Sequence, residues 1–151
     1  MALKNRRELI LRRLVEIALA LPGVEDVRRN SGTMDAARRP AILINDGDEF
    51  STDDDRAAKL QKSGVFLTTM SPEITIFSTG STVEMERPLS DLSVALVDAI
   101  WRDATINSLT GTNGSFRYNG CSTNDAFGQR LEGEMKVNLE FTYPFMVGET
   151  V

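Results

Sequence analysis

The residues in this sequence that are best suited to chemistry are the acidic side chains of the segment DGDEFSTDDD, which begins at Asp46. Clustered carboxylates are the ligands that Ca²⁺ prefers, so the segment must be compared with an EF-hand loop. That loop needs Gly at its sixth position and Glu at its twelfth, where this sequence has Ser51 and Ala57. We therefore interpret the segment as a solvated acidic loop and predict no metal site, while a looser divalent-cation site stays open. The carboxylates concerned are Asp46, Asp48, Asp53, Asp54 and Asp55.

Other catalytic groups lack the partners that they need. The chain has no histidine, which removes the most common general base and the most common zinc ligand. Cys121 is its single cysteine, so it has neither a histidine to activate it nor a second cysteine for an internal disulfide. No Gly-rich phosphate loop is present. We predict no catalytic residue and no cofactor; a small enzyme using Asp46, Asp48 and a metal is the alternative, which tight divalent-metal binding in a calorimetric titration would favour.

The charges are unevenly distributed along the chain. The net charge of the whole chain is −5, but residues 1–39 carry a charge of +4 and residues 40–151 a charge of −9. Nucleic-acid-binding proteins usually have a basic surplus, so direct nucleic-acid binding is not expected. The two parts are instead suited to attract each other, within one chain or between copies.

The sequence favours a cytoplasmic protein with no membrane segment. No stretch approaches the roughly 20 apolar residues that a membrane-spanning helix requires. The apolar run near the N-terminus is interrupted by Arg12, Arg13 and Glu16, so it does not have the pattern of a signal peptide.

Two long periodic stretches define the expected architecture. Gly133–Phe145 alternates apolar and polar residues, which predicts a half-buried strand. Asn5–Leu21 has apolar residues at helical spacing and stops at Pro22-Gly23, which predicts an amphipathic helix. Both stretches are long enough to cross a small domain, so the simplest arrangement is a helix lying along one face of a sheet.

The rest of the chain adds strands and a second helix. The short apolar run Ala41–Ile44 is expected to be a central strand, and Asp46–Lys62 a long polar loop, with a helical turn over Asp55–Lys62 as an open alternative. Trp101 lies toward the end of the second helix, where a core or helix–sheet contact is expected. The other predicted elements are an extended segment over Val24–Asn30, one bent strand or two strands over Val65–Met70 and Ile74–Phe77, a helix over Leu89–Asn107 and a strand over Gly114–Ser122.

We therefore predict a single α+β domain over residues 1–151. Its sheet is expected to be mixed and mainly antiparallel, with about 4–6 strands and two main helices packed on one face.

Four segments of the sequence resemble the tail terminator proteins of long-tailed bacteriophages, also called minor tail or tail completion proteins. The segments are RRELILRRLVEIALALPGVEDVRRN, RRPAILINDGDE, PLSDLSVALVDAIW and VNLEFTYPF, in this order. The resemblance implies a virion structural protein that assembles as a ring, usually a hexamer, on the last ring of the tail tube. Such a ring ends tube polymerisation and provides the surface to which the head–tail connector attaches. It also implies a place in the host cytoplasm during assembly and then at the head-proximal end of the virion tail.

A closed ring needs two different, complementary patches on each subunit. Our hypothesis from the sequence is that acidic residues around Asp53, Asp54 and Asp55, with Asp46 and Asp48, form one patch. The opposite patch on a neighbouring copy or on the tube would be basic and would contain Arg12, Arg13, Arg38 or Arg39. A neck protein that joins the connector to the tail is the alternative in the same setting.

Overall fold

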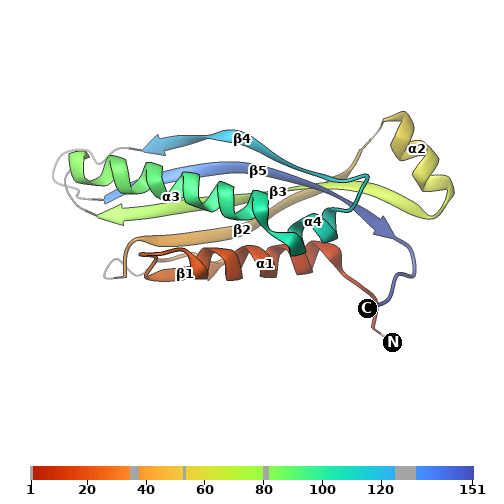
Figure 1. Cartoon of the computed structure of the whole chain (residues 1–151), viewed down its shortest axis with the longest axis horizontal. Coiled ribbons are helices and arrows are strands. Elements are labelled where there is room, and N and C mark those ends of the chain that lie inside the picture. Colours follow the sequence, from red (N-terminus) through yellow and green to blue (C-terminus); the bar gives the residue numbers. More distant parts are fainter. Residues whose placement is uncertain (1, 35–37, 53, 80–81, 125–131) are drawn as a thin grey trace.

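A computed structural model describes residues 2–34, 38–52, 54–79, 82–124 and 132–151 of the protein. It confirms the α+β class: helices lie against a five-stranded mixed sheet (Figure 1). The helices are α1 (Arg6–Ala20), α2 (Asp55–Lys62), α3 (Thr82–Arg102) and α4 (Ala104–Thr110). The strands are β1 (Asp26–Arg29), β2 (Ala41–Ser51), β3 (Val65–Thr79), β4 (Ser115–Asn124) and β5 (Glu132–Met146).

The strand order is β1-β2-β3-β5-β4, with β1 and β2 parallel and the other neighbours antiparallel. The expectation that Ala41–Ile44 is central was wrong, because β3 takes the middle place and β2 lies beside the edge strand β1. Apolar residues on both faces indicate an interior strand, but they do not say which one. The segments on either side of Pro72 form one continuous strand, β3.

The alternation in β5 places one apolar row in the core. These residues are each at most 6% exposed: Met135, Val137, Leu139, Phe141 and Tyr143. Helix α1 packs against them through a buried stripe that includes Ile10, Leu14 and Ile17. The helix begins where the Asn5 side chain accepts a hydrogen bond from the Glu8 amide at 3.0 Å. Sheet and helices therefore share one hydrophobic core.

The predicted helix over Leu89–Asn107 is two helices. Asp103 has an extended backbone, with φ −75° and ψ 117°, and its carboxylate accepts a hydrogen bond from the Ile106 amide at 2.9 Å. This N-cap starts α4 immediately after α3 has ended at Arg102. The apolar period continues across the break, which explains why periodicity alone predicted a single helix.

The long polar loop predicted over Asp46–Lys62 was wrong for its first part, whereas the alternative of a helical turn over Asp55–Lys62 is confirmed as α2. Strand β2 continues through Ser51 beside β3, with an irregularity in register between Asn45 and Asp48. Gly47 lies there with φ 69°, and a Cβ atom at this position would collide with the backbone carbonyl of Ser71. Glycine therefore allows the strand to bend and continue. Its acidic residues project from an exposed strand end, which polar composition alone does not distinguish from a loop.

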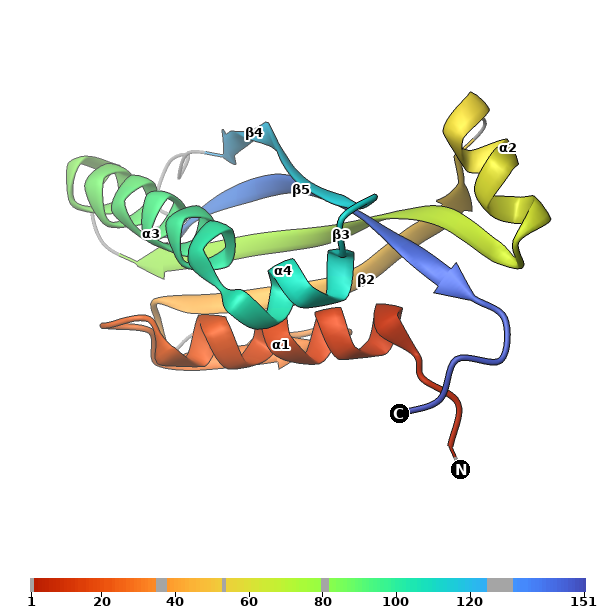
Figure 2. The same ribbon diagram turned by 45° about the vertical axis from the view of Figure 1, so that its right-hand side comes forward.

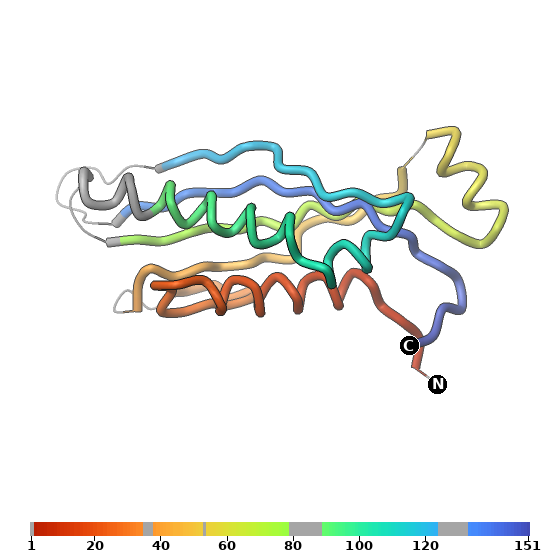
Figure 3. The backbone as a smooth tube through the Cα atoms, viewed as in Figure 1, coloured from red at the N-terminus to blue at the C-terminus, as the bar shows by residue number. Residues whose placement is uncertain are grey.

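Helices α1, α3 and α4 lie on the same side of the sheet, whereas α2 stands at the far end of β2 and β3 (Figure 2). The two chain ends lie together (Figure 3), where the Lys4 amide donates to the Glu149 carbonyl at 2.8 Å. None of the described helices is long and apolar enough to cross a lipid bilayer.

Candidate interaction surfaces

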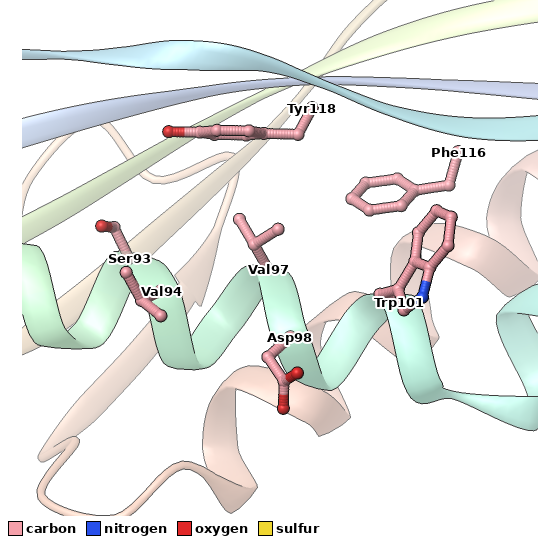
Figure 4. Close-up of a pocket in the computed structure, with 7 residues that line it drawn as sticks. All are labelled: Ser93, Val94, Val97, Asp98, Trp101, Phe116 and Tyr118. Carbon is pink, nitrogen blue, oxygen red and sulfur yellow. The ribbon is translucent and has the colours of Figure 1, made fainter.

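An open apolar groove separates the second half of α3 from β4 (Figure 4). It has a volume of about 360 Å³. Its apolar wall consists of Val94, Val97 and Trp101 from α3 and Phe116 and Tyr118 from β4, and its polar residues are Ser93 and Asp98. Such a groove is suited to receive an apolar side chain from another molecule.

The groove is built on the core and open to solvent. The Phe116 ring lies 5.1 Å from the ring of Phe141, a core residue of β5, and 6.3 Å from the Trp101 ring. Trp101 therefore makes the predicted helix–sheet contact, but its side chain is not part of the core because the residue is 66% exposed. Val94, about two helical turns earlier, is equally exposed at 66%. Rigid support and an exposed indole are typical of an interaction surface.

The groove also lies at an edge of the sheet. Strand β4 pairs with β5 on one side, and no strand of the described ranges pairs with its other side. An edge strand exposes unpaired backbone donors and acceptors, which are available to a neighbouring molecule. The β4 edge thus combines an apolar groove with open backbone groups.

The opposite face of the sheet carries the polar row of β5. Lys136 and Asn138 are exposed on it, and the Thr142 hydroxyl lies 2.9 Å from that of Thr69 on β3. Charges of both signs are mixed in this row. This face is exposed to solvent, and it has no excess of positive or negative charge that would favour one kind of partner.

A second exposed apolar group lies at the end of the molecule near the chain termini. Leu3, Phe145 and Val147 are exposed there, and Phe145 packs edge-on against Phe66 with 6.3 Å between ring centroids. At the same end of the molecule, the Tyr143 hydroxyl of β5 donates a hydrogen bond to the Glu49 carboxylate of β2. Burial and this carboxylate raise the pKa of Tyr143 well above its usual value. The tyrosine therefore remains a hydrogen-bond donor.

Several of the predicted interface charges are paired within the chain. Arg29 donates to Asp46 at 2.7 and 2.9 Å and to Glu8 at 2.9 and 2.8 Å. These bonds, with Arg12 as a further donor, lower the pKa of Glu8 to about 2, and Arg29 likewise lowers the pKa of Asp46. Arg29 thus connects β1 to β2 through Asp46 and to α1 through Glu8.

The same holds for Arg13. Its guanidinium donates to both carboxylate oxygens of Asp103, with distances of 2.6 to 3.1 Å, and to Glu16 at 2.8 Å. These bonds keep the pKa of Asp103 below its usual value and attach α1 to the start of α4. Arg13 therefore has a structural role in the chain, whatever it contacts in an assembly.

The remaining basic candidates lie apart from one another. Arg12 is exposed and pairs with Glu8 at 2.8 Å. Arg38 donates to the Glu25 carbonyl at 2.7 Å, and the Arg39 guanidinium lies 5.1 Å from the centre of the Phe77 ring. Arg12 is therefore on α1, whereas the other two are beside the start of β2.

The acidic candidates are also spread out. Asp54 caps α2 by accepting from the Ala57 amide at 2.6 Å, and Asp55 is in the first turn of that helix. Asp48 is exposed on β2, and Asp53 lies outside the described residues. Those predicted acidic and basic residues that the structure describes thus form no single site within one chain; a contact between copies stays a prediction.

Sequence reasoning missed the groove as a surface. Its signal was present in α3, where Val94 and Trp101 are seven residues apart and lie outside the buried leucine stripe. What could not be foreseen was the position of β4, which places Phe116 and Tyr118 opposite them.

Among the described residues, no three His, Cys, Asp or Glu side chains gather closely enough to hold a metal ion. The sequence matches no protein-family model and no curated protein.

Proposed function

We propose that this protein is a structural subunit of a bacteriophage tail, which closes the tail tube as a ring and presents the surface for head attachment. The observation that carries the proposal is that the two edges of the sheet are unlike. One edge has the apolar groove of α3 and β4, and the other has the charged helix α1 beside β1. Unlike edges favour head-to-tail contacts, which close into a ring when the rotation between copies is suitable.

The tail setting comes from the resemblance of the four sequence segments to tail terminators. The positions of the exposed apolar side chains also support this setting. A ring on a tube needs lateral contacts between copies and an axial contact with the tube below it. Exposed apolar side chains occur at two separate places that could make these two contacts, the groove and the end that carries Leu3 and Phe145. In this proposal α1 and α3 are the two main helices of one face, and the polar face of β5 remains for the lumen or the tube.

The acidic patch remains part of the proposal. Asp54 and Asp55 project at the α2 end, where they are available to the tube or to the connector protein. Charge reversal of both residues should then weaken tube capping. Unchanged assembly and capping would exclude the patch.

The proposal is tested with tubes polymerised from the tail-tube protein of the same genome. Addition of the purified protein should stop elongation, and electron microscopy should show an added ring at one end of each tube. Binding to portal-containing filled heads and not to tubes would instead support the neck protein. Binding to neither structure would contradict a tail function of either kind.

A further inference from the structure

The groove of α3 and β4 is an incomplete apolar contact. Trp101 and Val94 expose two thirds of their surface, although the groove floor reaches the core through Phe116. Asp98 lies between them along the helix, and its exposed carboxylate points away from β4 (Figure 4). A partner that completes this contact should provide an apolar side chain with a cation beside it.

The opposite edge of the subunit provides this combination on α1. Leu19 is 60% exposed, and the side chain of Arg12 is 69% exposed. Seven residues are close to two helical turns, so these side chains lie in one row. Arg13, which is bound to Asp103 of the neighbouring segment, projects from a different side of α1. Arg12 is two residues, about 200° around the helix, from the buried Leu14, so the row of Arg12 and Leu19 faces solvent on the outer flank of α1.

The spacing of the two rows is the same. Trp101 and Val94 are also seven residues apart, so each row places its two contacts about 10.5 Å apart. Helices α1 and α3 run in opposite directions along the sheet (Figure 1). In a ring whose axis follows the strands, α1 of one copy would thus lie antiparallel to α3 of the next. Arg12 is then level with Asp98 and Trp101 when Leu19 is level with Val94.

We infer that the groove of α3 and β4 binds the outer flank of α1 from a second copy of this chain, with Leu19 against Val94 and Arg12 against Asp98 and Trp101. The inference rests on the proposed ring and assigns its lateral contact. Each charge now bonds a partner one helical turn away, at 2.8 Å: Asp98 bonds the exposed Arg102, and Arg12 bonds Glu8, whose side chain is 32% exposed. Exchange of these pairs costs little, because Arg12 and Asp98 are themselves exposed and Glu8 keeps its bonds to Arg29. The Arg12 guanidinium also gains the face of an indole, a favourable contact for a cation.

Disulfide cross-linking tests the contact directly. In a background with Cys121→Ser, the double variant Leu19→Cys with Val94→Cys is oxidised alone at high concentration and also bound to tail tubes. We expect a ladder of covalent multimers that ends at the size of the ring. The matched control combines Leu19→Cys with Val147→Cys, because Val147 is 67% exposed but lies at the other end of the molecule. The control should give no ladder.

Charge reversal tests the polar half of the contact. Arg12→Glu and Asp98→Lys should each raise the protein concentration needed for half-maximal ring formation on tubes at least tenfold. The double variant should recover most of this loss, whereas Glu25→Lys, an exposed charge that no proposed contact uses, should have no effect. Thermal unfolding of each variant verifies that it is folded, because all of these side chains are exposed.

The outcomes separate this inference from the proposed function. Capping of tubes by the native protein without a ladder, and with Arg12→Glu harmless, would overturn the inference and leave the function standing. A ladder in the protein alone, without binding to tubes, would support the contact and contradict the tail function. Cross-links from Val94→Cys to the tube protein in place of a second copy would overturn the assigned occupant.

Discussion

Helices α1 and α3 lie on the same face of the sheet and bury similar apolar stripes, but their flanks are used differently. The flanks of α1 are fastened by ion pairs to distant parts of the chain: Arg6 to Glu149, Arg13 to Asp103 and Glu8 to Arg29. On α3, the flank toward β4 carries the exposed Val94 and Trp101. Charged residues on the sides of α1 thus hold the subunit together and leave only the row of Arg12 and Leu19 for another molecule, whereas α3 leaves apolar side chains along its flank toward β4. High charge in a sequence is therefore a poor guide to where a partner binds.

The comparison first requires that both stripes are equally buried. Leu14 of α1 and Leu96 of α3 are both fully buried, so Leu14→Ala and Leu96→Ala should each lower the free energy of unfolding by about 2–5 kcal/mol. Urea denaturation measures both losses. Leu19→Ala, at an exposed position of α1, is the control and should change stability by no more than about 0.5 kcal/mol. A loss below about 1 kcal/mol at either buried leucine would show that its helix does not share the core.

The next effect concerns the ion pair that attaches α1 to α4. Asp103→Ala removes both the acceptor of the Ile106 amide and the partner of Arg13, and should cost about 2 kcal/mol by urea denaturation. Asp103→Ser keeps a capping oxygen but loses the ion pair, so it should cost about half as much. Equal losses in the two variants would show that the cap contributes nothing to stability. No loss in Asp103→Ser would show that the ion pair contributes nothing.

Ionisation of Glu8 should make α1 sensitive to acid. The Arg29 and Arg12 side chains lower its pKa from 4.5 to about 2, so the folded state favours the charged form. A lowered folded-state pKa gives stability that is fully present above the unfolded value and is lost as pH falls from about 4.5 toward 2. The native protein should therefore be more stable than Glu8→Gln near pH 7. This difference should shrink over that acidic range, as measured by urea denaturation at each pH. In an Arg29→Gln background, the effect of Glu8→Gln on the free energy of unfolding at pH 7 should be smaller. An unchanged effect would show that Arg29 is not its source.

The sequence predicted the elements with strong periodicity. The strand over Gly133–Phe145 and the helix over Asn5–Leu21 correspond to β5 and α1, because each buries a single apolar row. The errors occurred where another force overrides the pattern. A capping carboxylate at Asp103 divides a helix whose apolar period continues, and Gly47 lets β2 bend and extend into a segment whose composition is typical of a loop.

The candidate surfaces were harder to predict than the fold. Charge counting selected Arg13 and Asp46, but their partners Asp103 and Arg29 are distant in sequence and become neighbours only on folding. The groove depends on β4 lying beside α3, and strand order cannot be deduced from alternation along single strands. Arg12 is the one predicted residue that the further inference keeps, with Asp98 in place of the acids around Asp54 as its partner.

The substitution with the smallest expected effect on stability, Val94→Asn, tests whether the flank of α3 toward β4 has a structural role or binds another molecule. Val94→Asn replaces a side chain that is 66% exposed, so it should alter the free energy of unfolding by no more than about 0.5 kcal/mol. Analytical ultracentrifugation of the concentrated protein should nevertheless show weaker self-association, because an amide in the groove loses its hydrogen bonds to water when Leu19 of another copy covers it. Val147→Asn, at 67% exposure, is the matched control and should leave both quantities unchanged. A large loss of stability with unchanged association would mean that Val94 stabilises its own subunit, as Arg13 of α1 does. The contrast between the two helices would then disappear.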